Sequence, residues 1–182
     1  MTQRFLLLFA LALVACESKP TSPATGAPSA SAAPSAGGLL AVGSPAPAIE
    51  GTAHNGERVS LKELAGKSVV VYFYPKDDTP GCTVEAQGLR DEWSALQAAG
   101  ATVIGVSTDD TASHKAFAEK YSLPFLLLPD PDGAVARAFG VPLTLGHAKR
   151  VTFVIGKDGK IAKVFPDVNP KGHAQEVLAA VR

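Results

Sequence analysis

The sequence is poor in cysteine, with only Cys16 and Cys82 among its 182 residues. Two cysteines exclude a disulfide-dense scaffold and a cysteine-based zinc cluster, so each one needs its own explanation. The chain also lacks an excess of charge, because 17 Lys and Arg balance 17 Asp and Glu. Without a basic run it has no electrostatic footprint for nucleic acid, and we expect no nucleic-acid partner.

Long hydrophobic runs are also missing, apart from ten apolar residues, Phe5 to Val14, that follow Arg4. As a helix this run spans ~15 Å, half of a ~30 Å hydrocarbon core, so residues 1–15 are predicted to be a signal peptide and not a membrane span. The segment ends in Leu-Val-Ala-Cys16, which resembles a bacterial lipobox. That resemblance implies lipidation of Cys16 and a protein anchored in the bacterial cell envelope, facing the periplasm. The alternative is an ordinary secretory signal with an incidental cysteine.

The segment after Cys16 is dominated by small residues and proline. Residues 17–38 contain six Ala, five Ser, four Pro, three Gly and two Thr. Such a composition buries too little apolar surface to offset the entropy of ordering the chain. Residues 16–38 are therefore predicted to be a lipidated cysteine followed by a disordered tether, and the folded domain is predicted to span 39–182. Membrane contact is expected through the lipid anchor alone.

The remaining residues alternate between short β-branched or aromatic runs and amphipathic stretches. Asp158-Gly159 between the last two runs is a hairpin signal. This order predicts an α/β fold in which helices flank a central mixed β-sheet on both faces. Ser60 to Glu63 matches a capping box that opens a short helix. The other predicted elements are strands at 69–74, 102–106, 125–128, 151–155 and 161–165, and helices at 80–99, 111–121, 132–139 and 171–181.

Cys82 follows the first of these strands after a short loop. Thr79 is a natural N-cap and Pro80 suits the first helical position, so Cys82 should be the third residue of a helix. There its sulfur would lie near unpaired backbone N–H groups at the positive end of the helix dipole, which favours the thiolate. The position suits a nucleophile. The blander alternative is a small buried hydrophobic residue.

The segment PKDDTPGCTVEA resembles the active site of peroxiredoxins, in which Pro, Thr and Cys stand where Pro75, Thr79 and Cys82 stand here. The similarity is greatest to the peroxiredoxin Q or bacterioferritin comigratory group, and it covers roughly residues 42–181. It continues through residues 105–107, 113–115, 123–125 and 150–155.

The resemblance implies a thioredoxin-like fold and thiol-dependent peroxidase activity without a cofactor or metal. It makes Cys82 the nucleophile, Thr79 its hydrogen-bonding partner, Pro75 a residue that shapes the pocket and Arg150 the cation. The expected substrate-binding residues are Thr79, Gly81, Cys82 and Arg150. The substrates would be hydrogen peroxide and organic hydroperoxides.

One position departs from that group. Many members carry a resolving cysteine five residues after the first, where this chain has Gln87. With Cys16 lipidated, no partner for an internal disulfide remains, so the sequence resembles a one-cysteine variant. We then expect regeneration by an external thiol, either a thioredoxin-like protein or a low-molecular-weight thiol. Two alternatives stay open: a thiol-disulfide oxidoreductase, although no Cys-x-x-Cys pair is present, and a non-catalytic binding or holdase module.

Other conspicuous residues receive structural interpretations. The four histidines never form an i, i+4 pair, so they are predicted to be solvated and not metal ligands. Trp93 is predicted to pack in the core, and Glu85 to be a structural helix charge. Residues 130–133 are predicted to form a turn and not a calcium loop. The histidines are His54, His114, His147 and His173.

Overall fold

The computed structural model describes residues 38–182. The predicted signal peptide, the lipidation of Cys16 and the tether up to residue 37 lie outside the described residues and stay predictions. Among residues 38–182, no helix is both long and apolar enough to cross a membrane.

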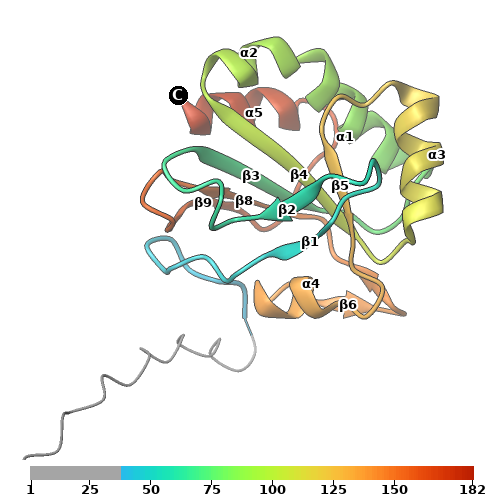
Figure 1. The fold of residues 1–182 in the computed structure, drawn as a ribbon, viewed down its shortest axis with the longest axis horizontal. Helices are drawn as coiled ribbons and strands as arrows, with labels where there is room; N and C mark the ends of the chain where they lie inside the picture. Colours follow the sequence, from blue (N-terminus) through green and yellow to red (C-terminus); the bar gives the residue numbers. More distant parts are fainter. Residues whose placement is uncertain (1–37) are drawn as a thin grey trace, which may run out of the picture. The chain divides into compact units, whose positions relative to one another are not determined.

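A five-stranded sheet forms the centre of the domain, in the order β5-β4-β3-β8-β9 (Figure 1). β3 (Ser68–Phe73) runs parallel to β4 (Ala101–Ser107), and β4 runs parallel to β5 (Leu126–Pro129). On the other side of β3, β8 (Val151–Ile155) and β9 (Ile161–Phe165) are antiparallel. The predicted mixed sheet is confirmed, and the last two strands begin and end where the sequence placed them.

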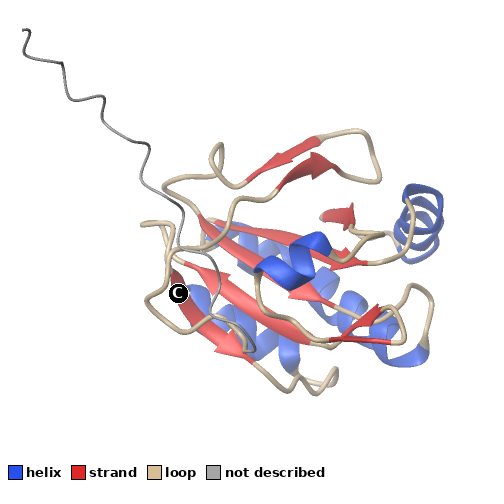
Figure 2. Cartoon of the chain, turned by 90° about the horizontal axis from the view of Figure 1, so that it is seen from below, coloured by secondary structure: helices blue, strands red, loops and turns tan. Residues whose placement is uncertain are grey.

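Helices cover both faces of this sheet (Figure 2). Successive side chains of a strand point to opposite faces, so β3 serves two hydrophobic clusters. Val70 and Tyr72 join the cluster that also contains Cys82, whereas Val71 and Phe73 join the other. The first face is covered by α1 (Pro80–Asp91), α2 (Trp93–Ala98), α3 (Thr111–Tyr121) and α5 (His173–Val181), and the second by α4 (Ala134–Ala138).

The single helix predicted at 80–99 is divided in two. α1 ends at Asp91 and α2 begins at Trp93, with Glu92 between them at φ −89° and ψ 5°. The spacing of apolar residues continues through this point and therefore gives no sign of the break. Trp93 packs on Phe125 with ring centroids 6.0 Å apart, which confirms its predicted place in the core.

The helix predicted from the capping box at Ser60 does not form. Ser60 is the buried last residue of β2 (Arg58–Ser60), and the chain after it makes successive turns. The N–H groups of Glu63 and Leu64 both donate to the Ser60 carbonyl, while the Glu63 carboxylate lies 3.7 Å from Arg58. The capping box does not form, because the Glu63 carboxylate lies near Arg58 of β2 and Glu63 contacts the backbone of Ser60 only through its N–H group.

Four short strands were not predicted. β1 (Glu50–Thr52) pairs with β2, and β6 (Leu143–Thr144) pairs with β7 (His147–Ala148). Each has two or three residues, too few for the alternation that reveals a longer strand.

The prediction that the histidines are solvated is wrong for two of them. His114 and His173 are 0% and 1% exposed. His114 Nδ1 lies 2.8 Å from Asp77, and His173 Nε2 lies 2.9 Å from the hydroxyl of Thr152. In each, one ring nitrogen meets a polar partner from a distant part of the chain, which lowers the cost of burying the ring.

Candidate active site

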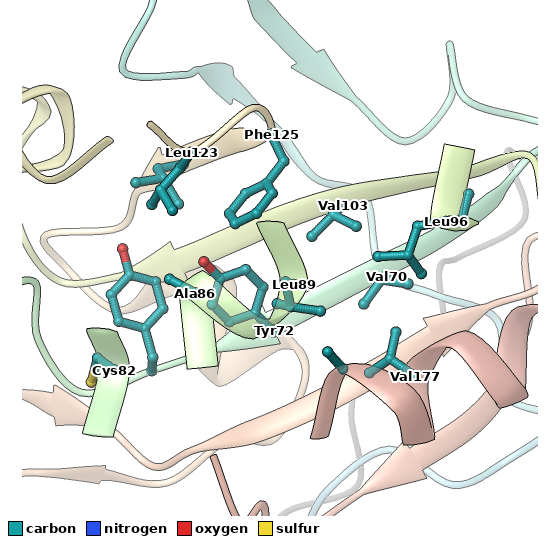
Figure 3. Packing of buried hydrophobic residues seen from close by; sticks show 14 of the residues in the cluster. Val70, Tyr72, Cys82, Ala86, Leu89, Leu96, Val103, Leu123, Phe125 and Val177 are labelled. Atoms are coloured by element: carbon teal, nitrogen blue, oxygen red, sulfur yellow. The ribbon is translucent and has the colours of Figure 1, made fainter. Parts of the chain in front are cut away.

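Cys82 lies in the first turn of α1, at the end of the core cluster (Figure 3). As predicted, Thr79 occupies the N-cap position with extended backbone, Pro80 begins the helix and Cys82 is its third residue. The cysteine is 1% exposed. Its sulfur is therefore held at the positive end of a helix and shielded from bulk water.

The predicted cation reaches this sulfur. Arg150 precedes β8, whose first residue, Val151, pairs with Phe73 at the end of β3, so the arginine lies at the same sheet edge as the loop before Cys82. Arg150 Nη2 donates to Cys82 Sγ over 3.2 Å. A guanidinium at this distance stabilises negative charge on the sulfur.

Glu85 is a site residue that the sequence did not reveal as such. It lies one turn after Cys82, is 1% exposed, and accepts a hydrogen bond from Arg150 Nη1. Burial raises the pKa of this carboxyl from 4.5 to about 7, against the opposing attraction of Arg150. The i, i+3 spacing from Cys82 on a helix that faces the core was the available signal.

Arg150 keeps its positive charge in this setting. Burial opposes the charged form, but Glu85 and Cys82 together raise the pKa of the guanidinium above its ordinary value. One arginine thus holds a carboxylate with Nη1 and the cysteine sulfur with Nη2.

Gly81 leaves the space that Arg150 occupies. A Cβ atom at this position would lie 3.3 Å from Arg150 Nη2 and 3.8 Å from Pro170 Cγ. The first distance is tighter than an ordinary van der Waals contact, so any side chain would press on the atom that binds Cys82. Gly81 therefore contributes to the site because its lack of a side chain leaves space for the Arg150 guanidinium.

Thr79 and Pro75 lie in the loop between β3 and α1, both partly buried. The Thr79 hydroxyl donates to the backbone oxygen of Lys76 over 3.0 Å and not to Cys82. Its oxygen accepts no capping hydrogen bond from an N–H group of the first turn. The structure thus differs from the expected Thr79–Cys82 hydrogen bond. Because the hydroxyl proton is used in this way, the lone pairs of Thr79 remain free to accept a hydrogen bond from a ligand.

Two further acidic residues of this loop bind α3 and were also missed. Asp77 is 6% exposed and accepts hydrogen bonds from Tyr74 and Ser113 besides its contact with His114. Asp78 accepts from Lys120 and Tyr121. Only the fold reveals the contacts with α3, since these partners lie 36 to 43 residues further along the chain.

A cleft of about 280 Å³ lies beside the first turn of α1. It is lined by Pro80, Gly81, Val84, Asn169, Pro170 and Lys171. Gly81 connects it to Arg150, so a group bound there would lie next to the site. Among residues 38–182, no group of three or more His, Cys, Asp or Glu side chains is arranged to hold a metal ion.

Comparisons with known proteins agree with this geometry. Residues 42–164 match the AhpC/TSA family. The chain is 44% identical over 146 residues to a peroxiredoxin bcp of Coxiella burnetii, an alignment that covers 76% of this chain and 97% of that protein.

Solved structures give the same answer. Peroxidoxin BcpB of Mycobacterium tuberculosis has a TM-score of 0.72 at 35% identity, covering 78% of this chain and 96% of its own. The Xanthomonas campestris bacterioferritin comigratory protein, studied for its alkyl peroxide reduction activity, has a TM-score of 0.69 at 35% identity and covers 73% and 89%. The chain therefore belongs to the AhpC/TSA family and is a peroxiredoxin of the bcp or Q group with a thioredoxin-like fold, a thiol-dependent peroxidase.

Proposed function

We propose that this peroxiredoxin reduces hydrogen peroxide and organic hydroperoxides with Cys82 as its one redox-active cysteine. The observation that carries the proposal is the buried arrangement in which Arg150 bridges Cys82 and Glu85. A single guanidinium placed there supports the thiolate before the reaction and charge on the leaving oxygen during it. The apolar walls of the cleft at Pro80 and Val84 offer room for the organic part of a hydroperoxide.

The oxidation step follows from these groups. The Cys82 thiolate attacks the hydroxyl oxygen of the hydroperoxide ROOH, so that an S–O bond forms while the O–O bond breaks. The sulfur loses two electrons and becomes a sulfenic acid. The RO⁻ fragment leaves next to Arg150 and takes up a proton to become an alcohol, or water when R is hydrogen. The free lone pairs of Thr79 orient the peroxide by accepting a hydrogen bond from its O–H group.

Reduction needs a thiol from outside the domain. Cys82 is the one cysteine among residues 38–182, and Gln87 occupies the position where many relatives of this group resolve the reaction. An external thiol R′SH attacks the sulfenic acid, forms a mixed disulfide and releases water. A second R′SH then restores the Cys82 thiol and leaves as R′SSR′. A thioredoxin-like protein or a low-molecular-weight thiol would serve.

The alternatives fit the site less well. A thiol-disulfide oxidoreductase needs a second cysteine near the first, and residues 38–182 offer none. A non-catalytic binding or holdase module has no use for a partly buried cation against a buried cysteine. The relatives also favour the peroxidase, since those compared above are peroxiredoxins.

We place the enzyme at the bacterial cell envelope, facing the periplasm, with its membrane contact at a lipid on Cys16. The support is the lipobox-like sequence that ends at Cys16 and the small-residue segment that follows it.

A turnover assay with dithiothreitol tests the proposed chemistry. The wild type should consume both hydrogen peroxide and cumene hydroperoxide. Cys82→Ser should consume neither while keeping its circular dichroism spectrum, because the substitution changes little volume. Peroxide consumption by Cys82→Ser at the wild-type rate would remove Cys82 from the mechanism.

A further inference from the structure

The loop that carries Pro75 and Thr79 is tied to α3 through a buried carboxylate. Asp77 accepts hydrogen bonds from Tyr74 and Ser113, each over 2.7 Å, and lies 2.8 Å from His114 Nδ1. Its own backbone N–H donates to Asp109 over 2.9 Å. Desolvation opposes the charged form, but the contacts with His114, Tyr74 and Ser113 outweigh it and lower the pKa of Asp77, so it binds as an anion.

A second, more exposed tie follows at the next residue. Asp78 accepts hydrogen bonds from Lys120, over 2.7 and 2.9 Å, and from the Tyr121 hydroxyl over 2.5 Å. Its φ is +56°, a left-handed conformation that L-residues seldom adopt. The loop is therefore held by α3 in a conformation that its own backbone does not favour.

The contact between the loop and α3 is mainly polar. A cleft of about 180 Å³ remains between them, lined by Asp77, Asp78, Ser113, Ala116, Phe117 and Lys120. Apolar packing between the loop and α3 is thus incomplete. The hydrogen bonds of Asp77 and Asp78 therefore hold the loop in place. The next residue, Thr79, is the N-cap of α1, so any movement of the loop is passed directly to the turn that carries Cys82.

We propose that Asp77 and Asp78 are positioning residues, which tie the loop to α3 and thereby hold Cys82 against Arg150. The tie has opposite effects on the two half-reactions. A fixed first turn keeps the sulfur 3.2 Å from Arg150 and favours attack on a small peroxide. The same fixed turn keeps Cys82 1% exposed, which restricts the approach of a larger external thiol. This inference rests on the proposed function for its two rates, although the exposure of Cys82 is measurable without it.

The test removes the donors on α3 and leaves the loop sequence intact. Tyr121→Phe keeps the ring that packs on Phe117, and Lys120→Met keeps an unbranched side chain. The double variant loses the tie to Asp78 and, with it, the contact of the Lys120 ammonium with the Tyr121 ring, 5.2 Å from its centroid. Lys115→Met is the matched control. Lys115 is exposed on the same helix, and its ammonium group lies 3.9 Å from the carboxylate of Glu119, which is also on α3 and not in the loop.

Three rates are measured for each protein: oxidation of Cys82 by one equivalent of hydrogen peroxide, reduction of the sulfenic acid by dithiothreitol, and alkylation of reduced Cys82 by iodoacetamide. In the double variant oxidation should slow about fivefold, while reduction and alkylation should each quicken by a similar factor, given the modest strength of exposed charged contacts. The control should match the wild type.

Two variants of Asp78 separate the tie from backbone strain, and a third variant tests Asp77. Asp78→Gly accepts the positive φ without cost but loses the side-chain bonds, so it should behave like the double variant. Asp78→Asn tolerates the same φ and can still accept a hydrogen bond from Tyr121, so its rates should lie between those of the wild type and those of the double variant. Asp77→Asn should show the largest change, provided that its circular dichroism spectrum is native.

The outcomes are distinct. Unchanged rates in the double variant, or oxidation and reduction shifting in the same direction, would overturn the positioning role. If wild-type Cys82 were not oxidised at all, the proposed peroxidase function would fall, yet faster alkylation of the double variant would still support the tie. An unchanged rate of Cys82 alkylation in the double variant would contradict the tie.

Discussion

Cys82 and Glu85 compete at the residue scale for one guanidinium. Arg150 donates to both, and the carboxyl has a pKa of about 7, so near neutral pH Glu85 is present both protonated and ionised. When Glu85 is protonated, a negative charge next to the sulfur disappears and the field of Arg150 acts on the thiolate alone. Glu85 is therefore a positioning residue that also adjusts the charge balance around Cys82.

Replacing Arg150 should test its two roles separately. Arg150→Leu should slow oxidation of Cys82 by about 10²-fold or more, the cost typical of removing a donor to a developing anion. Part of the loss reflects a smaller thiolate fraction, which high pH restores. Stopped-flow oxidation rates across pH therefore reveal the second role as a deficit that persists on the alkaline plateau.

A matched variant controls for the unpaired carboxylate that Arg150→Leu leaves behind. Arg150→Leu removes the partner of the buried Glu85. The double variant Arg150→Leu, Glu85→Gln should therefore be more stable than Arg150→Leu alone and should be oxidised equally slowly. Full recovery of the wild-type rate at high pH would show that Arg150 supports the thiolate and nothing more.

Glu85 should make stability depend on pH. Its pKa is about 7 in the folded protein against an ordinary 4.5, so the folded state binds the proton more tightly. The stability that this proton contributes is present at low pH and is lost as pH rises from about 4.5 through about 7. Urea unfolding at pH 5 and pH 8 should show the loss in the wild type and not in Glu85→Gln.

The effect of Glu85 is the difference in the free energy of unfolding between wild type and Glu85→Gln at each pH. His173, whose pKa is lowered by burial, acts in the opposite direction, because protonating it as pH falls through 6.5 favours the unfolded chain. This histidine is present in both proteins and cancels in the difference. A stability gap between wild type and Glu85→Gln that stays constant with pH would contradict the raised pKa.

Site residues whose place depends on neighbouring sequence could be predicted, and those whose place depends on distant contacts could not. Cys82, Thr79 and Gly81 stand in one loop and turn, and their places could be predicted from the sequence. Glu85 and Asp77 were not recognised, because a carboxylate is indistinguishable from a surface charge until a partner from another element buries it. The hydrogen bond of Thr79 depends on a loop conformation that no spacing specifies.

At the scale of elements, helices with clear caps were the most predictable. α3 begins after Asp110, whose carboxylate accepts from the Ser113 N–H, and spans the predicted residues 111–121. The break at Glu92 and the failed helix at Ser60 were not predictable in this way. In both cases the local pattern allowed a continuous or a new helix that the structure does not contain.

The first turn of α1 should give Cys82 a long-lived sulfenic acid. α1 is regular from Pro80 to Asp91, and on a regular helix residues five apart have Cα atoms ~8.7 Å apart, beyond the ~7 Å that a disulfide allows. With Gln87 at that place, unwinding of the turn brings no second cysteine within reach of Cys82. Dimedone should trap Cys82 after one equivalent of peroxide, and scarce thiol should lead to sulfinic acid by intact mass.

Introducing the missing cysteine provides the control. Gln87→Cys should lose two hydrogens on oxidation and escape dimedone if α1 retains the ability to open. Quantitative Cys82–Cys82 dimers of the wild type, with no dimedone adduct, would contradict the one-cysteine cycle.

At the scale of the whole domain, the site exists because three strand ends meet. β3 and β4 are parallel and β8 is antiparallel to β3, so the carboxyl ends of the first two strands and the start of the third lie at one edge. Cys82 follows β3, Asp109 follows β4 and Arg150 precedes β8. This is the edge at which α/β proteins gather their ligand sites, and no single element could build it alone.

The two cysteines should divide the work of the protein between anchoring and chemistry. If Cys16 is lipidated, several acyl chains at one terminus hold the protein on a membrane stably, whereas a single chain would bind only weakly. Cys16→Ser should therefore move the protein from the membrane fraction to the soluble fraction and leave peroxide turnover intact. Cys82→Ser should do the reverse, staying on the membrane without activity.

Each variant thus serves as the control for the other, since both lose one thiol and each should lose one property. Fractionation with immunoblotting reports the location, and turnover with dithiothreitol reports the chemistry. A wild-type protein recovered in the soluble fraction, with an intact mass that shows Cys16 unmodified, would refute the anchor. It would leave the peroxidase untouched, because the geometry around Cys82 is built entirely from residues of the folded domain.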